Sequence, residues 1–190
     1  MKDFTRLSLN IVCLFLISTQ LRAQMDDETI INRALARMKV LAAAKDVVKA
    51  IQVQNVAHAA LSQSEIDTLD ADWQANRETP DHPLIRSVLE NESSLYLTKT
   101  KSRSRGLYRE VFIMDARGLL VGSSDVTSDY WQGDEDKWQK TYAVGPDAYF
   151  VDELKQDAST GAYQIQISYT VTDPATGKAI GAVTAGIHID

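Results

Sequence analysis

The chain has 190 residues, of which 44% are hydrophobic and 24% charged, and its formal net charge is −6 at pH 7. These values are those of an ordinary globular protein, and the length predicts a single domain once an export signal is removed. Residues 1–23 hold three basic residues and one acidic residue, a charge of +2, so residues 24–190 carry −8. An acidic domain of this kind is not expected to bind nucleic acid or anionic membranes, which require clustered Lys and Arg.

Residues 1–23 are predicted to be a cleaved secretory signal. A basic start is followed by the apolar stretch Leu7–Ile17, and Ala23 is the small residue before the expected cleavage site. The apolar stretch is shorter than the roughly 20 residues that a membrane-spanning helix needs. We therefore expect a periplasmic protein of residues 24–190, with an uncleaved membrane anchor as the alternative.

The region 25–105 is predicted to be helical. Neither glycine nor proline occurs from Asp27 to Thr79, and apolar residues recur at steps of three, four or seven, as on one face of a helix. The apolar positions of this face are Ile31, Leu35, Met38, Leu41, Val48 and Ile51. We expect a long helix from about Asp27 to Leu61, a second helix opened by Ser64 that ends before Thr79, and a third from about Leu84 to Thr98.

The region 106–190 is predicted to form a sheet. Two strand-like runs, Leu107–Met114 and Leu119–Ser123, flank a hairpin turn. A short helix is expected from Asp134 to Tyr142. Three further strands, 148–154, 163–172 and 179–189, are joined by turn-rich connectors at 157–161 and 173–178. This order predicts an α+β fold in which a long N-terminal helix and shorter helices pack on a five-stranded antiparallel sheet.

A series of short stretches in the second half of the chain occurs in a characteristic order. It consists of Val111–Asp115 with Gly118, Thr127–Glu135 with Lys137 and Trp138, and then Ile167–Ser168, Val171–Asp173, Gly177 and Ile180–Gly181. The series resembles the single Cache family of extracytoplasmic sensor domains, which are PAS-like and also known as PDC-type. The resemblance implies one sensor domain over residues 24–190 with a PAS-like sheet.

The same resemblance implies a ligand pocket on the sheet, covered by the segment between the second and third strands. Small carboxylates, amino acids or amines are typical ligands of such domains. In receptors of this kind the last strand leads into a transmembrane helix, whereas this sequence ends at Asp190. We therefore expect a freestanding member that acts through a separate, membrane-bound sensor protein.

The predicted ligand site centres on four aromatic residues between the second and third strands. Trp138 and Tyr142 are four residues apart and share a helix face, and Tyr130 and Trp131 lie just before them. Rings with polar tips suit a pocket that needs apolar walls and a few oriented donors. The alternative is that these rings only fill the space between this segment and the sheet.

Charged and hydroxyl side chains complete the predicted site. Lys140 is placed to neutralise a ligand carboxylate, and Asp152 in the third strand to hold an amine. Of the mid-strand neighbours Ser168 and Tyr169 only one can face the pocket, and Ser168 is the candidate. Each has a simpler alternative as a solvated or structural residue. Arg117 at the hairpin tip is a second candidate to neutralise a carboxylate, but there we favour a solvated side chain. Asp173 is expected to start its turn by hydrogen-bonding its own backbone.

No catalytic, metal or cofactor site is predicted, and we do not expect an enzyme. The sole cysteine, Cys13, lies in the predicted signal. The histidines, His58, His82 and His188, are far apart and stand outside any metal-binding or catalytic-triad motif.

The sequence therefore predicts a periplasmic small-molecule-binding sensor protein that functions in signal transduction. The expected ligand is an organic acid, an amino acid or an amine, and the expected partner is a membrane-bound sensor protein. The alternative is a structural or protein-interaction module of the cell envelope that binds no ligand. In that alternative the Ala-rich long helix forms a homodimer surface.

Overall fold

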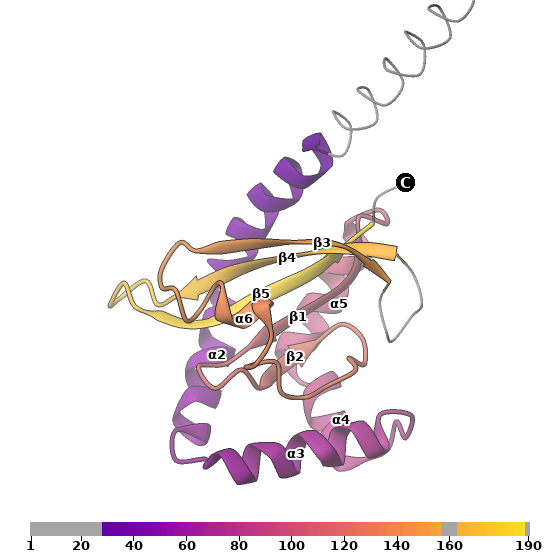
Figure 1. Ribbon diagram of the computed structural model, residues 1–190, viewed down its shortest axis with the longest axis vertical. Coiled ribbons are helices and arrows are strands. Elements are labelled where there is room, and N and C mark those ends of the chain that lie inside the picture. Colours follow the sequence, from indigo (N-terminus) through magenta and orange to yellow (C-terminus); the bar gives the residue numbers. More distant parts are fainter. Residues whose placement is uncertain (1–27, 157–162, 189–190) are drawn as a thin grey trace, which may run out of the picture. The chain divides into compact units, whose positions relative to one another are not determined.

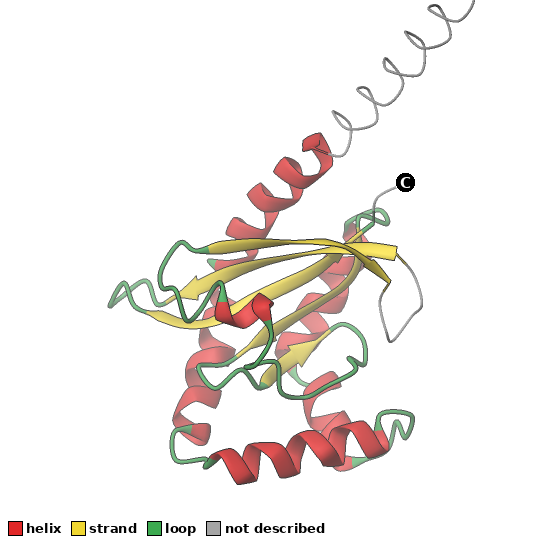
Figure 2. Cartoon of the chain, viewed as in Figure 1, coloured by secondary structure: helices red, strands yellow, loops and turns green. Residues whose placement is uncertain are grey.

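The computed structural model describes residues 28–156 and 163–188 (Figures 1 and 2). Residues 28–34 belong to an N-terminal unit and are helical, and every element named below belongs to the second unit, Leu35–Asp190. The predicted signal and Asp27 lie outside the described residues. Among the helices of the described residues, none is long and apolar enough to cross a membrane.

Helices form the N-terminal part of the second unit. After the helical residues 35–42 come α2 (Lys45–His58), α3 (Gln63–Asn76), α4 (Pro83–Leu89) and α5 (Glu92–Arg103). The helix α3 begins with a capping box in which Ser62, rather than the predicted Ser64, pairs with Glu65. The Ser62 side chain accepts from the Glu65 backbone N–H, and the Glu65 carboxylate accepts from the Ser62 backbone N–H at 2.8 Å.

The prediction of one long helix as far as Leu61 is wrong, because the chain leaves the helical conformation at residues 43 and 44. Ala44 is extended, with φ −67° and ψ 133°. The sequence around the break is rich in alanine and favours helix, so local propensity does not explain it. Leu41 before the break and Val47 after it are both buried, which indicates that tertiary packing sets its position.

The predicted third helix, Leu84–Thr98, is also two helices, α4 and α5. Asn91 between them is extended, and its Oδ1 accepts a hydrogen bond from the Ser94 backbone N–H at 2.9 Å. Its Nδ2 donates to the carbonyl oxygens of Val88 at 3.0 Å and Val121 at 2.9 Å. A side chain that bonds nearby backbone groups competes with continuation of the helix and caps the next one.

The five predicted antiparallel strands are present. They are β1 (Tyr108–Met114), β2 (Leu120–Ser123), β3 (Tyr149–Gln156), β4 (Tyr163–Thr172) and β5 (Ala179–Ile187), in the order β2-β1-β5-β4-β3. The first and last strands in sequence, β1 and β5, are therefore neighbours in the middle of the sheet (Figure 1). The predicted connector 157–161 and the end of the fifth strand at Ile189 lie outside the described residues.

The two faces of the sheet have different neighbours, and α2 packs on one of them. Gly181 in β5 has no side chain, and a Cβ atom there would meet the side chain of Ile51 from α2. Val171 and Val183, which belong to this face, are fully buried. The other face lies under the segment 124–148, which joins β2 to β3.

This joining segment contains the short helix α6 (Asp136–Gln139). The helix predicted from Asp134 to Tyr142 is thus only four residues long. The backbone N–H of Thr141 bonds the carbonyl oxygen of Trp138 at 3.2 Å, three residues back, which tightens the chain after α6. Thr141 is fully buried.

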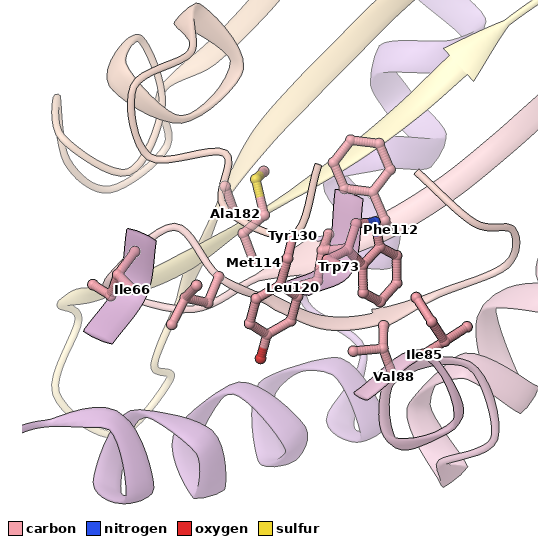
Figure 3. Packing of buried hydrophobic residues seen from close by; sticks show 10 residues of the cluster. Ile66, Trp73, Ile85, Val88, Phe112, Met114, Leu120, Tyr130 and Ala182 are labelled. Atoms are coloured by element: carbon pink, nitrogen blue, oxygen red, sulfur yellow. The ribbon is translucent and has the colours of Figure 1, made fainter. Parts of the chain in front are cut away.

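A hydrophobic cluster fills the end of the domain where α3, α4 and the joining segment meet β1 and β2 (Figure 3). Trp73 from α3 stacks on Tyr130 from the joining segment, with ring centroids 5.6 Å apart. Phe112 and Met114 from β1 and Leu120 from β2 complete its centre. The cluster therefore holds the start of the joining segment against the sheet.

Candidate functional site

The sheet face under the joining segment carries the residues of the predicted site. The strand register places one row of side chains across all strands on this face: Ser123, Phe112, Thr184, Ser168 and Phe150. The Nζ atom of Lys137 lies 5.5 Å from the Phe112 ring centroid, and that of Lys140 lies 4.5 Å from the Phe150 ring centroid. Because both lysines belong to α6 or follow it directly, α6 forms a roof over this row.

Buried hydroxyl groups occupy the middle of this face. Ser168 and Thr184 are fully buried, and their hydroxyl oxygens are 2.8 Å apart. Thr170, two residues after Ser168, points to the same face and is 1% exposed. Among the described residues, no hydrogen-bond partner reaches Thr170 Oγ1. Buried polar groups are nearly always hydrogen-bonded, so this hydroxyl group is a candidate to bond a ligand on this face.

Lys137 is the buried charged group of the roof. It is 9% exposed, whereas Lys140 is exposed. Its ammonium group donates to Gln132 Oε1 at 2.8 Å and forms an ion pair with Glu135 at 2.9 Å. A lysine is almost never this buried unless it is paired. The roof therefore places one cation above the Phe112 part of this row.

A buried carboxylate lies on the same face, further towards the start of β1. Glu110 is 6% exposed, and its Oε1 accepts hydrogen bonds from Gln164 at 2.7 Å and from Gln166 at 3.0 Å. Gly186 in β5 leaves the space that the Gln164 side chain fills. This face thus combines a cation on the roof with an anion on the sheet, and it can interact with ligand groups of either sign.

The predicted aromatic residues divide into two groups. Tyr130 is buried against Trp73, and its phenol has a raised pKa because of burial and, secondarily, the nearby charge of Asp115. Trp138 and Tyr142 lie together, as their spacing predicts, with ring centroids 4.8 Å apart. Tyr130 is thus a buried member of the hydrophobic cluster, and Trp138 and Tyr142 are partly buried against that cluster.

Both tryptophans of the joining segment use their indole N–H groups to bind the β1–β2 turn. Trp131 Nε1 donates to the Arg117 carbonyl oxygen at 2.9 Å, and Trp138 Nε1 donates to the Asp115 carbonyl oxygen at 3.1 Å. Both rings pack against the hydrophobic cluster. These residues present apolar surface, since their only strong donors are already used.

The charged residues of the predicted site form ion pairs with neighbours in the sequence. Lys140 is exposed and pairs with Asp136 at 2.7 Å. Asp152 accepts from Lys155 at 2.8 Å and from the backbone N–H of Glu153 at 2.8 Å, in a part of β3 where the register is irregular. Surface pairs of this kind contribute little to stability.

Two further residues have structural roles. Arg117 at the hairpin tip, for which we favoured a solvated side chain, donates from Nη2 to the Leu61 carbonyl oxygen at 2.7 Å. Asp173 accepts from the Ala175 backbone N–H at 3.0 Å, which confirms the expected turn. This bond and one from Thr176 lower the pKa of the Asp173 carboxyl group.

Sequence reasoning missed Lys137, Thr170, Thr184 and Glu110. A signal for the first was present, because Lys137 and Thr141 are four residues apart and both turn inward. Thr170 shares the alternation phase of Ser168, so a prediction that places Ser168 in the pocket also places Thr170 there. Thr184 and Glu110 join the site through strand pairing, which no local pattern reveals.

Comparison with known proteins gives structural similarity only. The sequence matches no protein-family model and no curated protein. The ligand-binding domain of the Pseudomonas aeruginosa PAO1 amino acid chemoreceptor PctC, in complex with GABA, is similar with a TM-score of 0.49 and 16% identity. That alignment covers 91% of this chain and 60% of PctC's.

Two other solved structures are similar in the same way. The ligand-binding domain of the Campylobacter jejuni chemoreceptor Tlp3, in complex with L-valine, has a TM-score of 0.42 and 14% identity, over 84% of this chain and 62% of that one. The sensor domain of the Vibrio cholerae histidine kinase DctB has a TM-score of 0.35 and 11% identity, over 91% and 58%. The chain thus spans about three fifths of these structures. At these levels of identity the similarity concerns the fold alone.

Proposed function

We propose that this chain is a ligand-binding sensor domain that takes a small molecule with a carboxylate group between α6 and the sheet. The observation that carries the proposal is a buried ammonium group, Lys137, above the sheet face that holds Thr170, whose hydroxyl group has no hydrogen-bond partner among the described residues. A buried hydroxyl without a partner is costly, and a ligand oxygen would remove that cost. A carboxylate would accept hydrogen bonds from both groups.

The remaining predicted residues have places in this proposal. Trp131, Trp138 and Tyr142 supply the apolar wall, with Tyr130 behind them. Lys140 and Asp152, which already form ion pairs, attract a charged ligand rather than hold it. An amino group on the same ligand would turn towards Glu110, so an amino acid fits the site as well as a simple organic acid.

We also propose that the protein is exported, cut after Ala23, and acts in the periplasm on a membrane-bound sensor protein. The support is the basic, apolar and small-residue pattern of residues 1–23. Intact mass measurement of the protein isolated from the periplasm tests this step. A mass corresponding to residues 24–190 agrees with the proposal, and a membrane-retained chain with residues 1–23 contradicts it.

One observation favours the alternative of an interaction module without a ligand. Lys137 already has two partners, Gln132 and Glu135, as a purely structural lysine would. Only the sensor function requires Lys137 and Thr170 to contact a ligand, so a binding experiment distinguishes the two functions.

The experiment is thermal unfolding of the purified protein with a panel of organic acids, amino acids and amines. A ligand at about 100 times its Kd adds roughly 2.7 kcal/mol of stability, which is readily detected. We expect carboxylates to raise the unfolding temperature. Their affinity should fall about tenfold or more in Lys137→Met and change little in Lys140→Met, because charged hydrogen bonds from buried groups contribute most. If Lys137→Met does not fold, Thr170→Val serves in its place. No shift across the panel, or equal shifts in all variants, contradicts the proposal and favours the interaction module.

A further inference from the structure

A second feature lies away from the proposed site. A cavity of about 470 Å³ lies between α2 and α5 and reaches β2 at the edge of the sheet. Its size is within the range of small-molecule sites, about 300–1,000 Å³. It is lined by residues of α2, by Asn91 and the start of α5, and by Val121 of β2. No residue of the joining segment takes part in this lining.

Irregular pairing in β2 gives the cavity part of its apolar wall. The register between β1 and β2 shifts so that Ile113 pairs with Gly122 and Met114 with Leu120. Val121 is left between these pairs, and its side chain lines the cavity. On the α2 side, Val53 is 64% exposed, an apolar side chain that a ligand in the cavity would cover.

The polar side chains of the wall have used their donors and kept their acceptors. The Nε2 of Gln54 donates to Asp115 Oδ2 and to the Leu120 carbonyl oxygen, both at 3.0 Å, which leaves the amide oxygen. His58 Nδ1 lies 2.9 Å from Asp115 Oδ2 and donates to this carboxylate, so in the neutral imidazole Nε2 is an acceptor. Ser93 Oγ donates to Asn91 Oδ1 at 2.6 Å and keeps its lone pairs. Within the described part of the chain, no protein donor reaches these three acceptors.

The charged residues at the rim of the cavity also favour a ligand that donates hydrogen bonds and carries a positive charge. Asp46 and Glu92 contribute two carboxylates, Lys49 contributes one ammonium group, and the rim is acidic in sum. None of the three takes part in an ion pair within the described residues. A cavity with apolar walls, several acceptors and an acidic rim suits a ligand with an apolar body and a donor-rich cationic group.

We infer that this cavity is a second binding site, distinct from the one under α6, and that it takes a small primary alkylammonium ion. The ammonium group would donate to the wall acceptors or the rim carboxylates, and the alkyl chain would lie on Val53, Ala57 and Val121. A carboxylate ligand does not fit, because the wall has few donors left for it.

The test is a titration of the isotope-labelled protein with n-butylammonium, followed by backbone amide chemical shifts. Butyrate has the same chain with the opposite charge, and tetramethylammonium has the charge without donors. We expect butylammonium to perturb residues of α2, α5 and β2, and the other two probes to bind at least fivefold more weakly. Perturbation of the joining segment alone, or equal affinity for all three probes, overturns the inference.

Variants make the assignment specific. The double change Asp46→Asn with Glu92→Gln should weaken butylammonium binding at least fivefold, whereas Lys49→Gln should tighten it. A matched control, Asp67→Asn with Glu78→Gln, makes the same change of charge at exposed positions of α3 and the loop after it, and should leave affinity within twofold. The inference is overturned if the control loses as much butylammonium affinity as the Asp46 and Glu92 variant, or if that variant loses none. In either case the rim carboxylates do not recognise the cation.

Discussion

His58 of α2 and Asp115 of the β1–β2 turn are hydrogen-bonded at 2.9 Å, although 57 positions separate them. Asp115 is fully buried and also accepts from Gln54 at 3.0 Å, from the Arg117 backbone N–H at 2.8 Å and from that of Leu119 at 3.0 Å. Its carbonyl oxygen accepts the indole N–H of Trp138. Asp115 therefore connects the β1–β2 turn both to α2 and to α6, the roof of the proposed ligand site.

The first prediction concerns this carboxylate. Asp115→Asn should lower the free energy of unfolding by about 3 kcal/mol, because the amide group presents N–H where Gln54 and His58 also present N–H, and buried donors lose their acceptor. Urea denaturation measures the loss. Asp173→Asn, at an exposed turn with a similar backbone hydrogen bond, is the control and should change stability much less. Equal effects at the two turns contradict the role given to Asp115.

The second prediction concerns the close approach of this turn to the joining segment. Gly118 has φ +81°, and a Cβ atom there would overlap the backbone of Gly133. Gly177 has φ +69° with open space around it. Gly177→Ala should lower the free energy of unfolding by about 1 kcal/mol, because alanine disfavours the left-handed conformation. Gly118→Ala should lower it by about 3 kcal/mol, because the backbone of Gly133 must also move. Chemical denaturation of both variants checks the difference, and similar losses show that the two segments separate easily.

The strands were predictable because alternation is a local pattern. Ile165, Ile167 and Tyr169 alternate with polar residues, and β4 lies where this alternation places it. The helix breaks at Ala44 and Asn91 were not predictable in the same way. The first lies in an alanine-rich stretch, and the second depends on a bond from Asn91 to Val121 in a distant strand.

The candidate site was predictable only in part, for a similar reason. The sequence locates the aromatic segment, but Lys137 and Lys140 are three residues apart, and only the docking of α6 on the sheet decides which of them is buried. The contact of His58 with Asp115 and the pairing of Ser168 with Thr184 likewise join residues that are distant in the chain. Local periodicity carries no information about such contacts.

The third prediction separates stability from binding at the proposed site. Thr170→Val removes a buried hydroxyl group that has no partner in the described structure, so it should stabilise the empty protein by about 1 kcal/mol and weaken a bound carboxylate. Thr184→Val removes the partner of Ser168 and should instead destabilise by about 1–2 kcal/mol. Thermal unfolding without ligand measures the stability of each variant, and thermal unfolding with a carboxylate ligand measures its binding. Destabilisation by Thr170→Val means that its hydroxyl group has a partner, such as a buried water, and argues against a ligand there.

The fourth prediction is a loss of stability at alkaline pH that depends on Tyr130. Burial raises the pKa of this phenol in the folded protein, while in the unfolded chain it ionises near its ordinary value of about 10. Above that pH the folded state binds more protons than the unfolded state, so the free energy of unfolding falls as the pH rises further. Tyr130→Phe should change stability by less than about 1 kcal/mol at neutral pH and should flatten the alkaline decline. Tyr142→Phe is the control, because Tyr142 is less buried, although burial also raises its pKa. Urea denaturation at a series of alkaline pH values measures the slopes, and an unchanged slope in Tyr130→Phe shows that other groups cause the decline.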